Sequence, residues 1–181
     1  MTLDGFRRMI TVRMDVDDAA LRDAFLRTSF LEALAALRAD QPPRWGRMSA
    51  QQMVEHLSWT FAGSNGRVQI ECPTPEGQWA SMKAFLHSNR PAPPGFMNPV
   101  LAEGLPALQH PSVPAALAAL KLELELFLAQ ERAHPDATHM HPLFGPLDLE
   151  EWSRTHFKHC VHHLLQFGLI EVEWAPARPR A

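Results

Sequence analysis

The sequence predicts an all-α protein with a four-helix bundle, and three observations support this fold class. Four long segments carry apolar residues spaced mainly by three and four positions, which is the period of an amphipathic helix. Good capping residues precede three of them, and segments rich in proline or glycine separate them. No convincing sheet pattern is present.

The first two helices are defined by their apolar stripes and their ends. The first is predicted from about Asp17 to Arg38 and is terminated by the two prolines that follow Gln41. Residues 10–14, just before it, are compatible with an extended arm. The second begins after Ser49, because Gln52 three residues later completes a capping box, and glycines 63 and 66 with asparagine 65 end it.

A long irregular insertion, residues 66–111, is predicted between the second and third helices. Its many prolines break regular structure, and only a short helix over 77–88 is expected. A connection of this length in a compact protein is often functional, so we expect it to shape a pocket. The third long helix follows, from Ser112 as the capping residue to about Arg132.

The fourth helix is predicted to begin near Asp148, with Glu151 completing another cap-plus-acid pattern, and to end near Gly168. A histidine-containing loop over 134–146 is expected before it. A short strand-like tail over 169–174 is expected after it.

Composition limits the classes of function. The 181 residues are 46% hydrophobic and 20% charged, which predicts one soluble domain over 1–181. The net charge of −3 and the lack of a long basic run argue against nucleic-acid binding. No secretory signal or membrane-spanning stretch is visible. With only Cys72 and Cys160 present, we expect a cytoplasmic protein.

Histidines are the main chemical signal. Seven of the ten lie between His134 and His163, and residues 156–163 read HFKHCVHH. His159 and His163 are four apart on the fourth helix and therefore share a face, so both rings can converge on one metal ion. His56, on the second helix, can face them across a bundle core and complete the group. The alternatives are a buried cluster of neutral, hydrogen-bonded histidines and an exposed cluster.

The strings RWGRMSAQQMVEHLSW and HPLFGPLDLEEWSRTHFKHCVHHLLQFG resemble the DinB/YfiT superfamily, and most closely one uncharacterised branch of it. The resemblance implies a four-helix bundle in which three histidines hold a divalent metal. His56 matches the histidine of the second helix, and His159 and His163 match the pair on the last helix. The superfamily includes thiol-dependent transferases and isomerases, and the resemblance makes a homodimer plausible.

Three imidazole ligands would leave a coordination position open for a small-molecule substrate, including a low-molecular-weight thiol. All-nitrogen ligation favours zinc or nickel, also suits iron or cobalt, and argues against magnesium or calcium. Three functions remain open at this point: a metal-dependent hydrolase or thiol-dependent transferase, a non-catalytic protein stapled by its metal, and a metal-free helical interaction protein.

Several residues near the three histidines in the sequence are candidates for supporting roles. Ligand histidines need hydrogen-bond acceptors for their second ring nitrogen, for which Glu55, Glu151, Gln166 and loop carbonyls are candidates. The other histidines around the fourth helix and its tryptophan have several interpretations. His156 and His162 are hydrogen-bond partners of the ligands, proton relays, further ligands or boundary residues. His139 and His141 either line a cavity mouth or lie in a solvated loop, and Trp152 either walls the site or packs in the core. Cys160 is expected to be a packed thiol.

Overall fold

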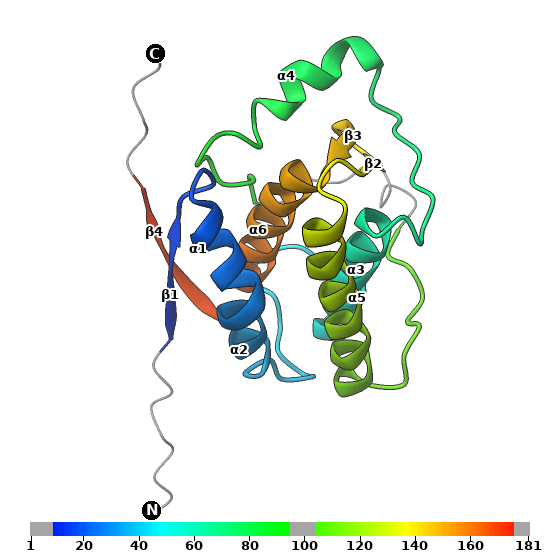
Figure 1. Cartoon of the computed structure of the whole chain (residues 1–181). Coiled ribbons are helices and arrows are strands. Elements are labelled where there is room, and N and C mark those ends of the chain that lie inside the picture. Colours follow the sequence, from blue (N-terminus) through cyan, green and yellow to red (C-terminus); the bar gives the residue numbers. More distant parts are fainter. Residues whose placement is uncertain (1–8, 95–103, 176–181) are drawn as a thin grey trace, which may run out of the picture.

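The computed structural model describes residues 9–94 and 104–175 (Figure 1). This part of the chain is mostly helical, with five helical segments and two small sheets. Helix α6 (Leu149–Gln166) is central, because it contacts the first, second, third and fifth α-helices of the chain. The expectation of four long helices is confirmed, whereas the expectation of no sheet is wrong.

The first long helical segment is continuous but not uniform. It consists of α1 (Ala19–Ala24), a π-helical turn (Phe25–Ser29) and α2 (Phe30–Leu34). The Asp18 side chain accepts a hydrogen bond from the backbone N–H of Leu21 and so caps its beginning. The α-helix ends at Leu34, four residues before the predicted end.

Helices α3 (Ala50–Ser64) and α6 begin where the sequence predicts, because both capping boxes form. Ser49 and Gln52 exchange side-chain and backbone hydrogen bonds at the start of α3. Asp148 and Glu151 do the same at the start of α6. These reciprocal bonds satisfy backbone donors that a helix start otherwise leaves unpaired.

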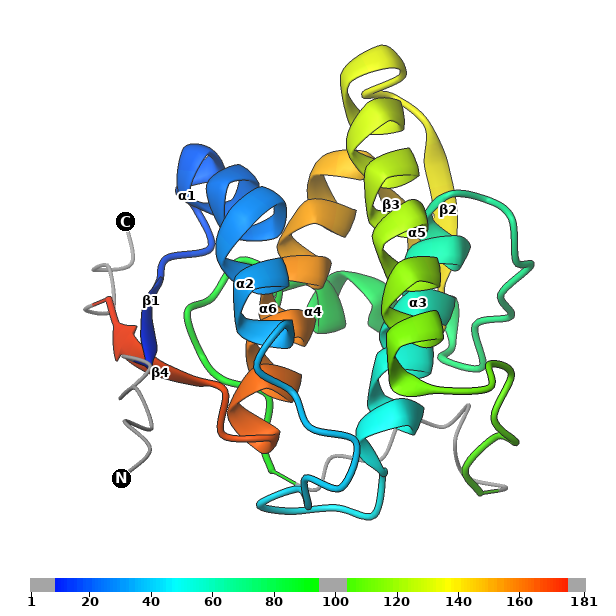
Figure 2. The same cartoon turned by 90° about the horizontal axis from the view of Figure 1, so that it is seen from below.

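Helix α5 (Val113–Ala133) packs along α3, as Figures 1 and 2 show from two directions. Ser112 caps it and Pro114 lies in its first turn, where the missing N–H costs nothing. The largest fully buried aromatic side chains come from several elements and join the helices into one core: Phe30, Phe61, Phe127, Trp152, Phe157 and Phe167.

Two sheets of two strands each pack against the helices. Strands β1 (Ile10–Met14) and β4 (Ile170–Trp174) pair in parallel, with Ile10 opposite Ile170. They lie on the side of α1 and α2 that faces away from α3 and α5 (Figures 1 and 2). The extended arm and the strand-like tail are therefore both confirmed as strands, and together they form a pair that was not predicted.

The second sheet replaces most of the predicted loop over 134–146. Strands β2 (Thr138–His141) and β3 (Gly145–Asp148) form an antiparallel hairpin immediately before α6. Gly145 adopts a positive φ of 73°, and a Cβ there would lie 2.3 Å from the Trp79 ring. Only glycine allows this close approach of the indole to the hairpin.

Within the described part of the insertion, regular structure is short. A 3₁₀ turn (Glu76–Gln78) leads into α4 (Trp79–Lys83), so the helix is shorter than the predicted 77–88. The described segment after α4 still folds back on the protein, because Leu86 is buried in the core. Residues 95–103 of the insertion lie outside the described part of the chain. Among the helices of the described residues, none is both long and apolar enough to cross a membrane.

Candidate metal centre

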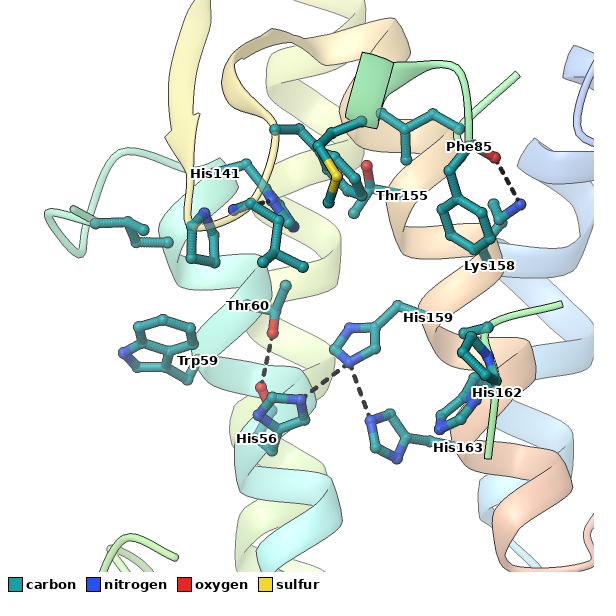
Figure 3. A pocket seen from close by; sticks show the side chains of 18 of the residues that line it. His56, Trp59, Thr60, Phe85, His141, Thr155, Lys158, His159, His162 and His163 are labelled. Carbon is teal, nitrogen blue, oxygen red and sulfur yellow. Dashed lines mark hydrogen bonds between the residues drawn. The ribbon is translucent and has the colours of Figure 1, made fainter. Parts of the chain in front are cut away.

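Three histidines from two helices meet at one edge of a cavity (Figure 3). The Nε2 atom of His159 lies 2.9 Å from Nε2 of His56 and 3.0 Å from Nε2 of His163. One nitrogen from each ring lies within 4.8 Å of the other two. Two nitrogens on one tetrahedral zinc lie about 3.3 Å apart for bonds of about 2.0–2.1 Å. The two short distances through His159 would therefore need to open by only a few tenths of an ångström to hold such an ion.

The helices explain why the three rings converge. His159 and His163 occupy successive turns of α6 and project to the same side. His56 lies on α3, which packs against α6. His163 is buried, while His56 and His159 are partly exposed to the cavity. The sequence-based grouping of His56, His159 and His163 is thus found in the structure.

Gln166 determines which ring nitrogen of His163 carries the proton. Its Nε2 donates to the backbone carbonyl of Trp45, so its Oε1 is the atom that lies 2.8 Å from Nδ1 of His163. Nδ1 must therefore donate, and the Nε2 lone pair of His163 is directed to the other two histidines. Of Glu55, Glu151 and Gln166, which the sequence offers as acceptors, Gln166 is the one that contacts a ligand ring.

Gly46 makes room for this amide. Its φ is +81°, and a Cβ at this position would lie 2.8 Å from Nε2 of Gln166. The backbone of residue 44 also donates to the carbonyl of Gln166 at 2.7 Å. The segment between α2 and α3 thereby holds the end of α6 and the orienting amide in place.

The three Nε2 atoms cannot all be satisfied by hydrogen bonds while the rings are neutral. If His159 carries a proton on Nε2, that proton can point to only one of its two neighbours in a linear bond. If it does not, its lone pair faces the lone pair of His163. In both cases at least one of the three Nε2 atoms is left without a hydrogen-bond partner in the group, which a cation at the centre would relieve.

Burial keeps these rings neutral. It lowers the pKa of His56 to about 4, and the nearby His162 adds to the effect. Burial likewise lowers the pKa values of His159 and His163 well below the usual value, and repulsion from neighbouring histidines contributes at both. Neutral imidazole is the form that binds metal.

His156 is not part of the cluster. It stacks on Phe61 and Trp152, and its Nε2 lies 2.8 Å from Oγ of Ser64. The Ser64 hydroxyl donates to the carbonyl of Phe61, so it accepts from His156, and Nδ1 of His156 is left without a hydrogen-bond partner. His156 is therefore a neutral core residue, and burial lowers its pKa strongly.

Of the other histidines near α6, His162 and His141 line the cavity and His139 does not. His162 lines the cavity and contacts the Trp45 ring edge-on. His141 is buried, stacks on Phe144 and lines the cavity, so the cavity interpretation is correct for it and the solvated-loop interpretation is wrong. His139 is half-buried, and its carbonyl accepts from the Trp152 indole.

The remaining sequence candidates have structural roles. Glu55 accepts from the backbone N–H groups of residues 109 and 110, and Glu151 binds Lys83 and caps α6. Trp152 is fully buried in the core. Cys160 is buried as well, and burial raises the pKa of its thiol well above the usual value, so the packed-thiol prediction is confirmed.

The cavity beside the histidines has a volume of about 370 Å³ and three apolar walls. One wall comes from α3 and its flanks, with Met48, Trp59 and Ile70. The second comes from the insertion, with Met82, Phe85, Leu86, Ala92 and Pro93. The third is the hairpin turn, with Pro142, Leu143 and Phe144. The prediction that the insertion shapes a pocket holds for these described residues.

Lys158 is the cavity residue that sequence reasoning missed. Its Nζ donates to the carbonyls of Phe85, Ser88 and Arg90 at 2.9, 2.6 and 2.8 Å, and lies 3.7 Å from the centre of the Phe85 ring (Figure 3). Burial lowers the pKa of this ammonium to about 7, and Arg90 contributes. A lysine within an otherwise buried helical face was the sequence signal, but its carbonyl partners lie in the insertion and have no recognisable pattern.

The lysine is expected to hold the cavity wall in place. Replacing Lys158 with methionine removes three bonds from a charged donor and should lower the free energy of unfolding by about 2 kcal/mol. Hydrogen exchange should rise in residues 79–90, measured by mass spectrometry. Lys121→Met, at an exposed position on α5, is the matched control. Equal exchange in both variants would contradict this role.

Together these features define a helical protein with a three-histidine cluster that opens on an apolar cavity. A family model for the DinB superfamily matches residues 20–167, which include all three histidines. The chain belongs to this superfamily. Comparisons with curated proteins and with solved structures gave no match.

Proposed function

We propose that this chain is a divalent-metal-binding protein of DinB/YfiT type and a metal-dependent enzyme, either a hydrolase or a thiol-dependent transferase. In this proposal its four long helices form the bundle of the superfamily, and His56, His159 and His163 hold the ion. The observation that carries the proposal is the meeting of three Nε2 atoms whose lone pairs no arrangement of protons satisfies. The cluster also adjoins a cavity large enough for a small molecule.

The donor set selects the class of metal. Three neutral nitrogens suit zinc or nickel first, and iron or cobalt as well. When bound, such an ion would supply Lewis-acid chemistry and lower the pKa of a water or thiol that enters the site. Gln166 would orient the His163 ring toward the ion, and the apolar walls would exclude bulk water.

Metal analysis tests the proposal directly. We expect purified protein to contain close to one equivalent of a transition metal, and chelated protein to bind one equivalent of Co²⁺ with the intense visible absorption of a four-coordinate site. Failure to bind any of zinc, nickel, cobalt or iron would contradict the proposal. Metal-dependent turnover of esters, amides or thiol adducts would then distinguish the enzyme from a protein that is only stapled by its metal.

The stapling alternative has its own support, because the ligands come from two packed helices, α3 and α6. It predicts a large fall in melting temperature on chelation and no ligand exchange at the metal. An enzyme instead requires that an exogenous ligand can exchange at the metal. Binding of an exogenous thiol to the Co²⁺ form therefore decides between an enzyme and a protein that is only stapled by its metal. A homodimer stays a prediction, for which sedimentation of the metal-loaded chain is the measurement.

Gln166 offers a test of the orienting hydrogen bond. Gln166→Leu removes the acceptor from Nδ1 of His163 and should weaken metal binding about 10–100-fold, the usual effect of losing an outer-shell partner. Competition with a chromophoric chelator measures this change. Gln78→Leu, at an exposed position, should leave the affinity unchanged. An unaltered affinity in Gln166→Leu would show that the amide does not support the site.

A further inference from the structure

The polar groups of the cavity offer few contacts to a ligand. The Thr60 hydroxyl donates to the carbonyl of His56 at 3.0 Å, and the Thr155 hydroxyl donates to the carbonyl of Glu151 at 2.9 Å. Both hydroxyl protons are thus used within their own helices, which leaves only oxygen lone pairs for a ligand. Nδ1 of His141 accepts from the backbone N–H of Leu143, so the neutral ring carries its proton on Nε2.

The charged group of the cavity, the Lys158 ammonium, is already fully engaged in hydrogen bonds with the protein. All three N–H bonds of the Lys158 ammonium have carbonyl acceptors in the insertion. Among the lining residues in the described part of the chain, Lys158 is the one lysine, and no arginine, aspartate or glutamate accompanies it. A cationic group on a ligand would therefore lose water here without gaining a counter-ion, and an anionic group could reach the Lys158 ammonium only by displacing one of its three carbonyl acceptors. Burial of either charge is costly.

The walls offer what an apolar ligand needs. Trp59, Met82, Phe85, Leu143 and Phe144 surround the space next to the histidines, as Figure 3 shows for the labelled aromatic side chains. Apolar surface of this kind binds hydrocarbon and aromatic groups by removing them from water. A volume of about 370 Å³ is at the lower end of the range for small-molecule sites.

We propose that the substrate of this site is an uncharged, predominantly apolar or aromatic small molecule with a single metal-binding head group. This inference rests on the proposed function, because the head group is directed to the ion held by His56, His159 and His163. It narrows the class of thiol that the site accepts. Amino-acid and peptide thiols carry carboxylate and ammonium groups. The cavity residues described above offer no carboxylate to the ammonium, and the one ammonium they could offer to the carboxylate is already bound by three carbonyls.

A matched pair of thiols tests the proposal on the Co²⁺-loaded full chain. Phenylmethanethiol and 4-(mercaptomethyl)benzoate differ by one carboxylate, and each reports its binding through the sulfur-to-cobalt charge-transfer band in the near ultraviolet. We expect the uncharged thiol to bind about tenfold or more tightly, because the carboxylate would be desolvated without a partner. Equal affinities, tighter binding of the carboxylate, or no binding of either thiol would overturn the proposal.

A substitution in the hairpin wall provides the control. Leu143→Lys places a cation in the third wall and should reduce the preference for the uncharged thiol, whereas Leu143→Met should retain it. An unchanged preference in Leu143→Lys would also count against the proposal, because the walls would then not determine selectivity.

The two proposals fail in different ways. Absence of binding of Co²⁺ and of zinc, nickel and iron would overturn the proposed function. The ligand class would then be tested on the metal-free chain by saturation-transfer NMR with the same two thiols. Stronger transfer to phenylmethanethiol would support the apolar site, and equal transfer would overturn it. Normal Co²⁺ binding without a preference would overturn the ligand class alone.

Discussion

Replacing His56 with alanine is expected to lower the affinity for divalent metal by more than about 100-fold, since loss of an outer-shell partner alone typically costs 10–100-fold. His56 supplies the only α3 ligand in the three-histidine group. Without it, only the two ring nitrogens of His159 and His163 on α6 remain to bind the ion. Cobalt titration followed by visible absorption, with elemental analysis after gel filtration, measures the loss.

The matched control is His162→Ala. This ring lines the same cavity and lies on α6 beside His163, but it contacts Trp45 and is not among the three that converge. Its removal should leave cobalt binding unchanged. Circular dichroism of both variants excludes unfolding as the cause. Retained metal in His56→Ala, or equal loss in the two variants, would mean that the ion is not held between α3 and α6.

The histidine group was predictable from the sequence because its parts are local. Spacing by four on one helix brings His159 and His163 together whatever the rest of the fold does. The capping boxes at Ser49 and Asp148 define where both helices begin within a few residues. The family resemblance then supplied the pairing of the two helices.

His156 shows where helical spacing is insufficient. It lies three residues before His159 and on the same side of α6, yet it is level with Ser64 and Phe61, farther along α3 than His56. The angular position of a residue around its own helix does not determine which residue of the neighbouring helix it contacts. That contact also depends on how far the two helices are shifted along each other when they pack, which no pattern in a single sequence contains.

The sheets were missed for a related reason. Strands β1 and β4 pair residues from opposite ends of the chain, and each has only five residues. The hairpin β2–β3 contains His139, His141 and Pro146, which carry little strand propensity. Its effect on the site is large, because its turn supplies the third cavity wall. Non-local pairing of weak strands becomes visible only in three dimensions.

Acidification is expected to unfold the chelated protein steeply below pH 6.5. Burial lowers the pKa of His141 to about 3 and that of His56 to about 4, and also lowers those of His156, His159 and His163. Because each folded-state pKa lies below the unfolded value of about 6.5, the unfolded chain binds more protons. The stability from neutral burial is therefore present above pH 6.5 and is lost as the pH falls toward the folded-state values.

The size of the effect follows from linkage. Each such histidine contributes about 1.4 kcal/mol per pH unit below 6.5, so His141 and His56 each remove about 2 kcal/mol by pH 5. The other three act in the same direction. Total stabilities of only about 5–15 kcal/mol are usual. Urea unfolding at a series of pH values measures the slope, which gives the number of protons taken up.

Two comparisons separate the core histidine from the metal group. His156→Phe removes a titrating ring that stacks between Phe61 and Trp152, so the slope should fall by about one proton between pH 6.5 and 5. Zinc should instead move the whole acid transition to lower pH, because an ion bound only by the folded state opposes protonation of its ligands. If neither His156→Phe nor zinc changes the acid transition, these buried rings do not determine the stability of the protein in acid. A shift with zinc that disappears in His56→Ala would tie the acid transition to the three-histidine group.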